Sequence, residues 1–140
     1  MKWLKTVAAF ANGEGGSLII GISDEDGSVV GINGMLQRHQ NSISKFKDAI
    51  TLAISDTIDP VPEYEFLDAR VDNHDVLAIN VYTDGLRCYA IYRGDVPTYY
   101  IRRGATTRVA DNNEVQELVR LRSAYAPAKL SPFFGHVEPF

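Results

Sequence analysis

The chain has 140 residues, of which 45% are hydrophobic and 23% are charged, as is typical of one compact domain. This composition excludes a disordered tail, a fibre and an array of several domains. The formal net charge of -4 at pH 7 also excludes a protein covered in positive charge. An acidic domain can still carry a small basic surface, and Arg102, Arg103 and Arg108 lie within one short segment.

Cys88 is the single cysteine, so the chain can form neither an internal disulfide nor a zinc site with several cysteines. A chain of this length buries enough surface to fold without either. No segment approaches the about 20 apolar residues that cross a bilayer, and the N-terminal residues are amphipathic rather than a signal peptide. We therefore expect a cytoplasmic protein that does not contact a membrane.

Hydrophobic spacing predicts the first elements of the chain. Residues 3–10 have apolar side chains at helical spacing, and this helix is expected to end at the glycine-rich segment 13–16. The apolar residues 17–22 and the residues 28–32 flank an Asp- and Gly-rich turn, which predicts a hairpin. Because residues 17–22 are apolar almost without a break, we expect them at the centre of a sheet with both faces covered.

The later elements follow from the same spacing and from turn residues. They are a long amphipathic helix over residues 41–57, strands over 64–71, 76–82, 89–92, 98–102 and 106–109, and a helix over 112–123. Asp111 and Glu114 have the spacing of a capping box at the start of the last helix. This order predicts an α+β fold in which helices pack on one mixed, mostly antiparallel sheet. We expect a single domain over residues 1–123 and an irregular, proline-rich tail over residues 124–140.

The residues that follow the first helix form a candidate phosphate loop, because glycines let backbone amides turn toward an anion. Its candidate contacts are Asn12, Gly13, Gly15 and Gly16. The loop lacks the lysine of a Walker motif, and its glycines follow a helix and precede a strand, which is the reverse of the dinucleotide fingerprint. Glycine is also the usual residue at the C-terminal cap of a helix, so a structural role is favoured.

The acidic turn at residues 24–26 is a candidate metal site, because carboxylate oxygens are suitable ligands for divalent cations. Its spacing is not that of a calcium loop, and a solvated turn is favoured. The histidines, His39, His74 and His136, do not have metal-ligand spacing, and Cys88 has no histidine beside it in the sequence. We therefore predict no metal ligand and no catalytic residue, with Asp24 as the single weak candidate for either role.

A tyrosine- and arginine-rich segment over residues 99–108 carries the clearest functional pattern. In a strand, Tyr100 and Arg102 share one face, and Arg103 lies on the other. Arginine binds phosphate through paired hydrogen bonds, to which Thr107 could add a neutral donor. The alternative, which we weigh equally, is that these arginines pair with acidic residues of the same chain.

Together these segments resemble the Schlafen AlbA-type DNA-binding domain, which is found at the front of bacterial transcriptional regulators and proteins related to ATP-dependent helicases. The resemblance covers about residues 3–122. It rests on Ala9-Phe10-Ala11-Asn12-Gly13-Glu14-Gly15-Gly16, Ser17-Leu18-Ile19-Ile20-Gly21-Ile22, Asp24 to Gly27, Val30-Gly31-Ile32, Tyr99-Tyr100-Ile101-Arg102-Arg103-Gly104 and Thr107-Arg108. It implies a Schlafen AlbA-like α+β fold.

The resemblance also bears on catalysis. Eukaryotic Schlafens that carry this domain cleave RNA with two glutamates from a segment ahead of the alanine–phenylalanine motif and an aspartate after the central strand. Asp24 matches the aspartate, but the two glutamates have no counterpart, because the chain begins only a few residues before Ala9. Metal-assisted hydrolysis would lack most of its ligands, so we do not expect a nuclease.

We therefore expect a module that binds nucleic acid, DNA rather than RNA, as part of a transcriptional regulator. Phosphate contacts are expected from Arg102, Arg103, Arg108 and Thr107, with Tyr100 stacking or packing and the glycine loop allowing close approach. No cofactor is predicted. The first alternative is a nucleotide-binding or metal-dependent hydrolase that holds ATP or Mg²⁺, and the second is an interaction domain that forms a homodimer through apolar surface left uncovered at its short N-terminus.

Overall fold

The computed structural model describes residues 2–23 and 25–123, so the candidate Asp24 and the expected tail over residues 124–140 lie outside the described residues. The described elements, in chain order, are α1 (Lys2–Asn12), β1 (Gly16–Ile20), α2 (Asn33–Leu36), the 3₁₀ turn η1 (Gln37–His39), α3 (Ile43–Thr57), β2 (Ile58–Asp59), β3 (Tyr64–Val71), β4 (His74–Val81), β5 (Ala90–Arg93), β6 (Val96–Arg103), β7 (Thr106–Val109) and α4 (Asn112–Ser123). The sequence patterns do not predict α2, η1 or β2.

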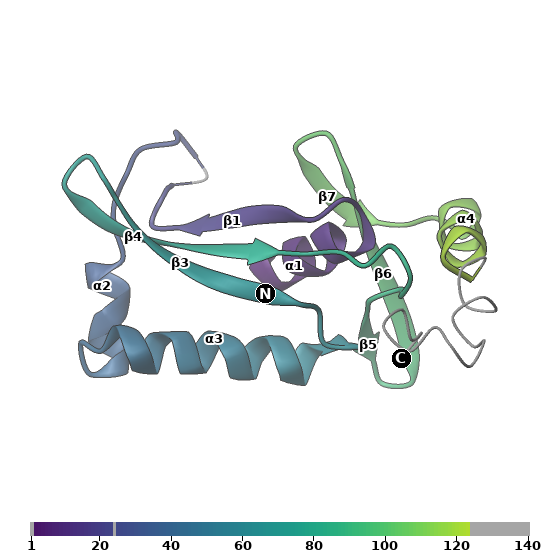
Figure 1. The fold of residues 1–140 in the computed structure, drawn as a ribbon, viewed down its shortest axis with the longest axis horizontal. Helices are drawn as coiled ribbons and strands as arrows, with labels where there is room; N and C mark the ends of the chain where they lie inside the picture. The colour runs from purple at the N-terminus through teal and green to yellow at the C-terminus, as the bar shows by residue number, and fades with distance from the viewer. Residues whose placement is uncertain (1, 24, 124–140) are drawn as a thin grey trace, which may run out of the picture.

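The strands form two sheets, with the order β1-β4-β3 in the first and β2-β5-β6-β7 in the second (Figure 1). Every pairing between these strands is antiparallel. The predicted α+β class is therefore confirmed, with two antiparallel sheets in place of one mixed sheet. α3 lies along the first sheet, whereas α4 lies beside the second sheet, at the opposite end of the molecule from α2 (Figure 1).

The central strand of the first sheet is β4, and the expectation that residues 17–22 occupy the centre is wrong. β1 pairs with β4 on one side and forms an edge of the sheet. Its apolar sequence has a different cause from the one expected. Leu18 and Ile20 pack against the core, while Ile19 on the opposite face is 46% exposed. The strand therefore has one buried face and one exposed face, and the apolar run is unbroken because the exposed face carries an isoleucine.

Residues 28–32 do not form a hairpin strand with residues 17–22, and one isolated bridge joins the two segments. The backbone conformation of two glycines prevents regular pairing of these segments. Gly21 and Gly31 have φ values of 111° and 75°, which interrupt a regular strand. The Gly21 carbonyl also accepts hydrogen bonds from the amides of Val30 and Gly31, which closes a loop at this point.

α1 and α3 form the main hydrophobic core with β4. The buried residues of this core include Leu4, Val7, Ala8 and Ala11 of α1, Phe46, Ile50 and Ile54 of α3, and Leu77, Ile79 and Val81 of β4. They recur every three or four residues in the helices and every second residue in the strand. The predicted helices and the predicted β3–β4 hairpin are therefore confirmed, and the hairpin turns at Asp72 and Asn73, which both have positive φ.

The glycine segment that follows α1 occupies space in which a side chain does not fit. Gly15 has a φ of 82°, and a Cβ at this position would lie 2.7 Å from the Val81 carbonyl oxygen. A Cβ at Gly16 would lie 2.8 Å from the Phe10 ring. The segment therefore ends α1 and leads directly into β1. α1 itself contacts strands of both sheets, so the helix links the second sheet to the first.

Replacing Gly15 with alanine should lower the free energy of unfolding by about 1–3 kcal/mol, because the new Cβ meets a backbone oxygen and the residue must keep a positive φ. Gly34→Ala is the matched control, since no atom lies within 4 Å of a Cβ at that position. The control should be neutral or slightly stabilising. Urea unfolding measures both variants, and equal stability of Gly15→Ala and the unchanged protein would contradict this account of the loop.

Candidate functional site

The β6–β7 hairpin divides the arginines of the tyrosine- and arginine-rich segment between two faces. Antiparallel pairing sets Arg102 opposite Thr107 and Ile101 opposite Arg108. Directly opposite residues project from the same face of a sheet, and successive residues project from opposite faces. Arg102 and Thr107 therefore lie on one face of the hairpin, and Arg103 and Arg108 lie on the other.

The face with Arg102 and Thr107 packs against α1. Arg102 Nη1 donates a 2.7 Å hydrogen bond to Thr107 Oγ1, and the Arg102 guanidinium carbon lies 5.3 Å from the centre of the Phe10 ring. Thr107 Oγ1 lies 3.3 Å from Thr6 Oγ1 of α1, so a hydroxyl hydrogen bond joins the hairpin to the helix. Within residues 2–23 and 25–123, Arg102 makes no ion pair with a carboxylate.

Tyr100 also faces α1, but its side chain is only 3% exposed. The Lys5 ammonium lies 5.5 Å from the centre of the Tyr100 ring. The ring therefore packs beneath a lysine and does not offer an open surface on which a base could stack.

The opposite face of the hairpin packs against α4, where Glu114 binds two arginines. Arg103 Nη2 lies 2.9 Å from Glu114 Oε2, and Arg108 donates to both carboxylate oxygens over 2.8 and 2.6 Å. The Arg108 hydrogen bonds and, after them, a hydrogen bond from the Asp111 amide lower the pKa of Glu114 to about 2, and the charges of Arg108 and Arg103 act in the same direction. Glu114 also completes the predicted capping box, because it accepts from the Asp111 amide while its own amide donates to the Asp111 side chain.

The alternative in which the arginines pair with acids of the same chain therefore describes Arg103 and Arg108 but not Arg102. One carboxylate, that of Glu114, serves two guanidinium groups, and Asp111 places a second negative charge near Arg108. Both arginines also remain accessible, since the side chains of Arg103 and Arg108 are 61% and 43% exposed.

The glycine loop and the arginine strand meet in one groove, although they are far apart in the sequence. The groove has a volume of about 570 Å³. Its walls are Ala9, Phe10, Gly13, Glu14, Gly15, Gly16 and Ser17 on one side and Arg102, Arg103 and Gly104 on the other. β5 pairs with β6 only as far as Tyr99, so it does not cover the end of β6 that lines the groove. Glu14 is the one acidic residue among these walls.

Two lysines of α1 stand beside Arg102 and were not identified by the sequence patterns. Lys2 and Lys5 line a second hollow of about 270 Å³ together with Arg102. Their spacing of three residues on a predicted helix places them on one face, which is a usable signal. That signal does not reveal that this helix face lies next to Arg102, which is about 100 residues later in the sequence.

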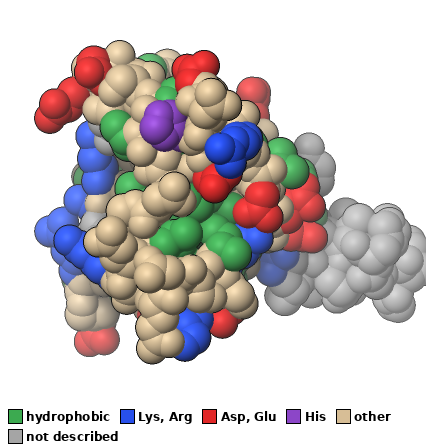
Figure 2. Space-filling model, turned by 90° about the vertical axis from the view of Figure 1, so that its left-hand side faces the viewer, with side chains coloured by type: hydrophobic (Ala, Val, Ile, Leu, Met, Phe, Trp, Pro, Cys, Tyr) green, Lys and Arg blue, Asp and Glu red, His purple; other side chains and the backbone are tan. Residues whose placement is uncertain are grey.

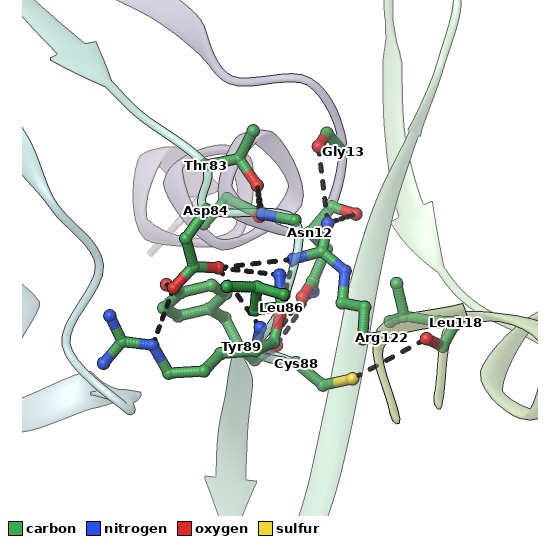
Figure 3. Close-up of polar contacts among 12 residues, drawn as sticks. Asn12, Gly13, Thr83, Asp84, Leu86, Cys88, Tyr89, Leu118 and Arg122 are labelled. Atoms are coloured by element: carbon green, nitrogen blue, oxygen red, sulfur yellow. Dashed lines mark hydrogen bonds and ion pairs between the residues drawn. The ribbon is translucent and has the colours of Figure 1, made fainter. Parts of the chain in front are cut away.

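The side chain of Asn12 is fully engaged in buried hydrogen bonds to the backbone and is not available to a ligand. Its amide nitrogen donates to the Tyr89 carbonyl over 2.8 Å, and its oxygen accepts from the Tyr89 amide over 2.7 Å (Figure 3). The same nitrogen donates to the Tyr100 carbonyl over 3.0 Å. Arg122 of α4 donates to the Asn12 carbonyl over 2.6 Å and also reaches the carbonyl of Arg87 (Figure 3). The loop candidate Asn12 therefore ties α1 to β6 and to the residue that precedes β5.

Two observations on the described residues bear on the chemistry of the other candidates. Burial raises the pKa of the Cys88 thiol, which opposes a nucleophilic role. In the part of the chain that the structure describes, no group of three or more His, Cys, Asp or Glu side chains could hold a metal ion. A search of the same residues for a helix long and apolar enough to cross a bilayer finds none.

An apolar hollow of about 520 Å³ lies between β1 and α3, and Trp3, Phe46 and Met35 are among its walls. Figure 2 views the end of the molecule that carries α2 and the β3–β4 turn, and hydrophobic side chains are exposed in the middle of that face. This hollow has no Lys or Arg in its walls, so it does not match an anionic ligand.

Comparison with known proteins relates the chain to one family. The family model described as Schlafen, AlbA_2 matches residues 1–111. A crystal structure of the DIP2311 protein from Corynebacterium diphtheriae is similar with a TM-score of 0.51 and 27% sequence identity. The similarity covers 86% of this chain and 19% of the DIP2311 chain, so the present sequence spans about a fifth of that protein's length. No curated protein matches the chain.

Replacing Asn12 with alanine should lower the free energy of unfolding by about 2–4 kcal/mol, because three buried backbone groups lose their hydrogen-bond partner. Asn113→Ala is the control, since Asn113 is an exposed residue in the first turn of α4. Urea unfolding compares the two variants. A loss of less than about 0.5 kcal/mol in Asn12→Ala would show that the amide does not hold the strands.

Proposed function

This chain belongs to the Schlafen AlbA_2 family, and we propose that it is a nucleic-acid-binding module of a transcriptional regulator, with DNA as the preferred ligand. The family is generally linked to nucleic-acid binding and to transcriptional regulators. Within the chain, the observation that carries the proposal is the groove in which the glycine loop faces Arg102 and Arg103.

The two walls of the groove contribute in different ways. The amides of Gly13 and Gly15 already donate to the Phe10 carbonyl, so these two amides are not available to a phosphate. The glycines border the groove with backbone alone, which lets a phosphate backbone approach the loop closely. Arg102 supplies the charge-assisted hydrogen bonds, because Thr107 takes up only one of its donor atoms.

Arg103 and Arg108 contribute when phosphate replaces Glu114. A carboxylate and a phosphate bind guanidinium through the same paired geometry, so Glu114 holds both arginines in the conformation that a phosphate requires. The exposure of both arginines leaves them within reach of a ligand. Binding then exchanges one anionic partner for another.

The contacts in this proposal are to phosphates and do not read bases. Phosphate contacts set the position of a protein on nucleic acid, whereas sequence is read at base edges. Tyr100 is buried, and the arginines lie on a short hairpin rather than on an exposed recognition helix. We therefore expect binding that depends strongly on salt and weakly on sequence.

The triple variant Arg102→Ala, Arg103→Ala and Arg108→Ala should bind DNA more weakly for every sequence tested. Its dependence of log affinity on log salt should be shallower by about 2–3 units, at roughly one unit for each lost phosphate contact. The matched control is Arg38→Ala, Arg70→Ala and Arg93→Ala, three exposed arginines outside the groove. Fluorescence anisotropy over a salt series measures both, and unchanged affinity and slope in the site variant would reject the proposal.

Replacing Glu114 with glutamine should tighten DNA binding by roughly three- to tenfold at low salt, because two arginines lose their competing partner. Glutamine still suits the capping box, so α4 should keep its first turn. Glu117→Gln is the control, since Glu117 lies on the same helix and pairs with Arg120. Equal DNA affinities of the two variants would show that Arg103 and Arg108 do not contact the nucleic acid.

A further inference from the structure

The hollow beside the groove has the composition of a phosphate pocket. Its walls are Lys2, Lys5, Thr6, Arg102, Ala105, Thr106 and Thr107, so three cationic side chains and three hydroxyl groups surround about 270 Å³. None of these described wall residues is acidic. This composition differs from the other face of the hairpin, where Glu114 already binds Arg103 and Arg108.

The polar groups of the pocket are already arranged by contacts with one another. The Arg102 guanidinium donates to the Thr107 hydroxyl, which lies 3.3 Å from the Thr6 hydroxyl. Thr6 is 8% exposed, so the base of the pocket is fixed in the core of α1. Lys5 is held at the rim by its contact with the Tyr100 ring. A ligand would therefore meet Arg102 and Lys5 in positions that these contacts already set, which reduces the side-chain entropy lost on binding.

Charge and wall composition indicate which phosphate fits. A phosphate within a nucleic-acid strand carries a single negative charge, whereas a phosphate monoester at a strand end carries about -1.5 to -2 at pH 7. Lys5 and Arg102, in a hollow whose described walls carry no acidic side chain, match the more highly charged monoester better. The described walls include no aromatic side chain on which a base could stack, so the pocket suits a phosphate group rather than a base.

We propose that this pocket binds the terminal phosphate of a nucleic-acid strand, and that the strand continues into the adjoining groove past Arg102, which lines both hollows. The inference rests on the proposed function and adds a preference for phosphorylated strand ends. Arg102 then contacts the terminal phosphate and the strand at the same time, and Lys5 contacts the terminal phosphate alone.

The test compares one short single-stranded oligonucleotide with a 5′-phosphate, a 3′-phosphate or hydroxyl groups at both ends. The unchanged protein should bind one phosphorylated form about tenfold more tightly than the hydroxyl form at low salt, because the extra group gains charge-assisted hydrogen bonds. Lys5→Met keeps the unbranched stem against Tyr100 and removes the charge, so the ratio of affinities should fall to within about twofold. Lys5→Arg should retain the preference.

Lys45→Met is the charge-matched control, since Lys45 is exposed on α3 and does not line the pocket. It should leave the ratio of affinities unchanged. Equal binding of all three oligonucleotides by the unchanged protein, or a preference that persists in Lys5→Met, would overturn the inference while leaving the proposed function in place.

A second measurement separates the two proposals. Thymidine 5′-monophosphate should raise the melting temperature of the unchanged protein, whereas thymidine should not, and Lys5→Met should lose the response. If the nucleotide acts in this way and no oligonucleotide binds, the pocket stands and the nucleic-acid proposal fails. If thymidine 5′-monophosphate has no effect and oligonucleotides bind without regard to their ends, the pocket assignment fails alone.

Discussion

The buried amide of Asn12 is the interaction on which the candidate site depends. Asn12 is the last residue of α1, and its side chain satisfies backbone groups of Tyr89 and Tyr100. It therefore joins the helix to β6 and to the residue that precedes β5. Arg122 adds a hydrogen bond from α4 to the carbonyl of the same residue. The glycine loop begins at the next residue, and the arginines follow Tyr100 along β6. One side chain therefore fixes the distance between the two walls of the groove.

The alternation of a single β-hairpin then gives its arginines different roles. Arg102 faces α1 and meets hydroxyl groups and an aromatic ring, whereas Arg103 and Arg108 face α4 and meet a carboxylate. The basic surface is consequently not a continuous row along the strand. It centres on Arg102, which borders the groove and the hollow that holds Lys2 and Lys5.

Local patterns in the sequence are sufficient to predict most of the elements of the fold and part of the candidate site. Helical spacing, the capping box of Asp111 and Glu114 and the β3–β4 turn depend on near neighbours, and the structure confirms them. The position of β1 and the loop at Gly21 and Gly31 depend on which segments pack together, which periodicity does not reveal. The same limit explains why the sequence does not predict Lys5 as a site residue. Lys5 lies near Arg102 only because α1 packs against the β6–β7 hairpin.

The ion pairs of Glu114 with Arg103 and Arg108 respond differently to pH and to ionic strength. With a pKa of about 2, this carboxylate stays ionised across the whole physiological range, so acidification in a cell does not discharge it. In the proposed function, competing anions rather than protons release Arg103 and Arg108. Ion pairs between exposed side chains weaken as the salt concentration rises, so we expect ionic strength rather than acidity to control this face of the hairpin.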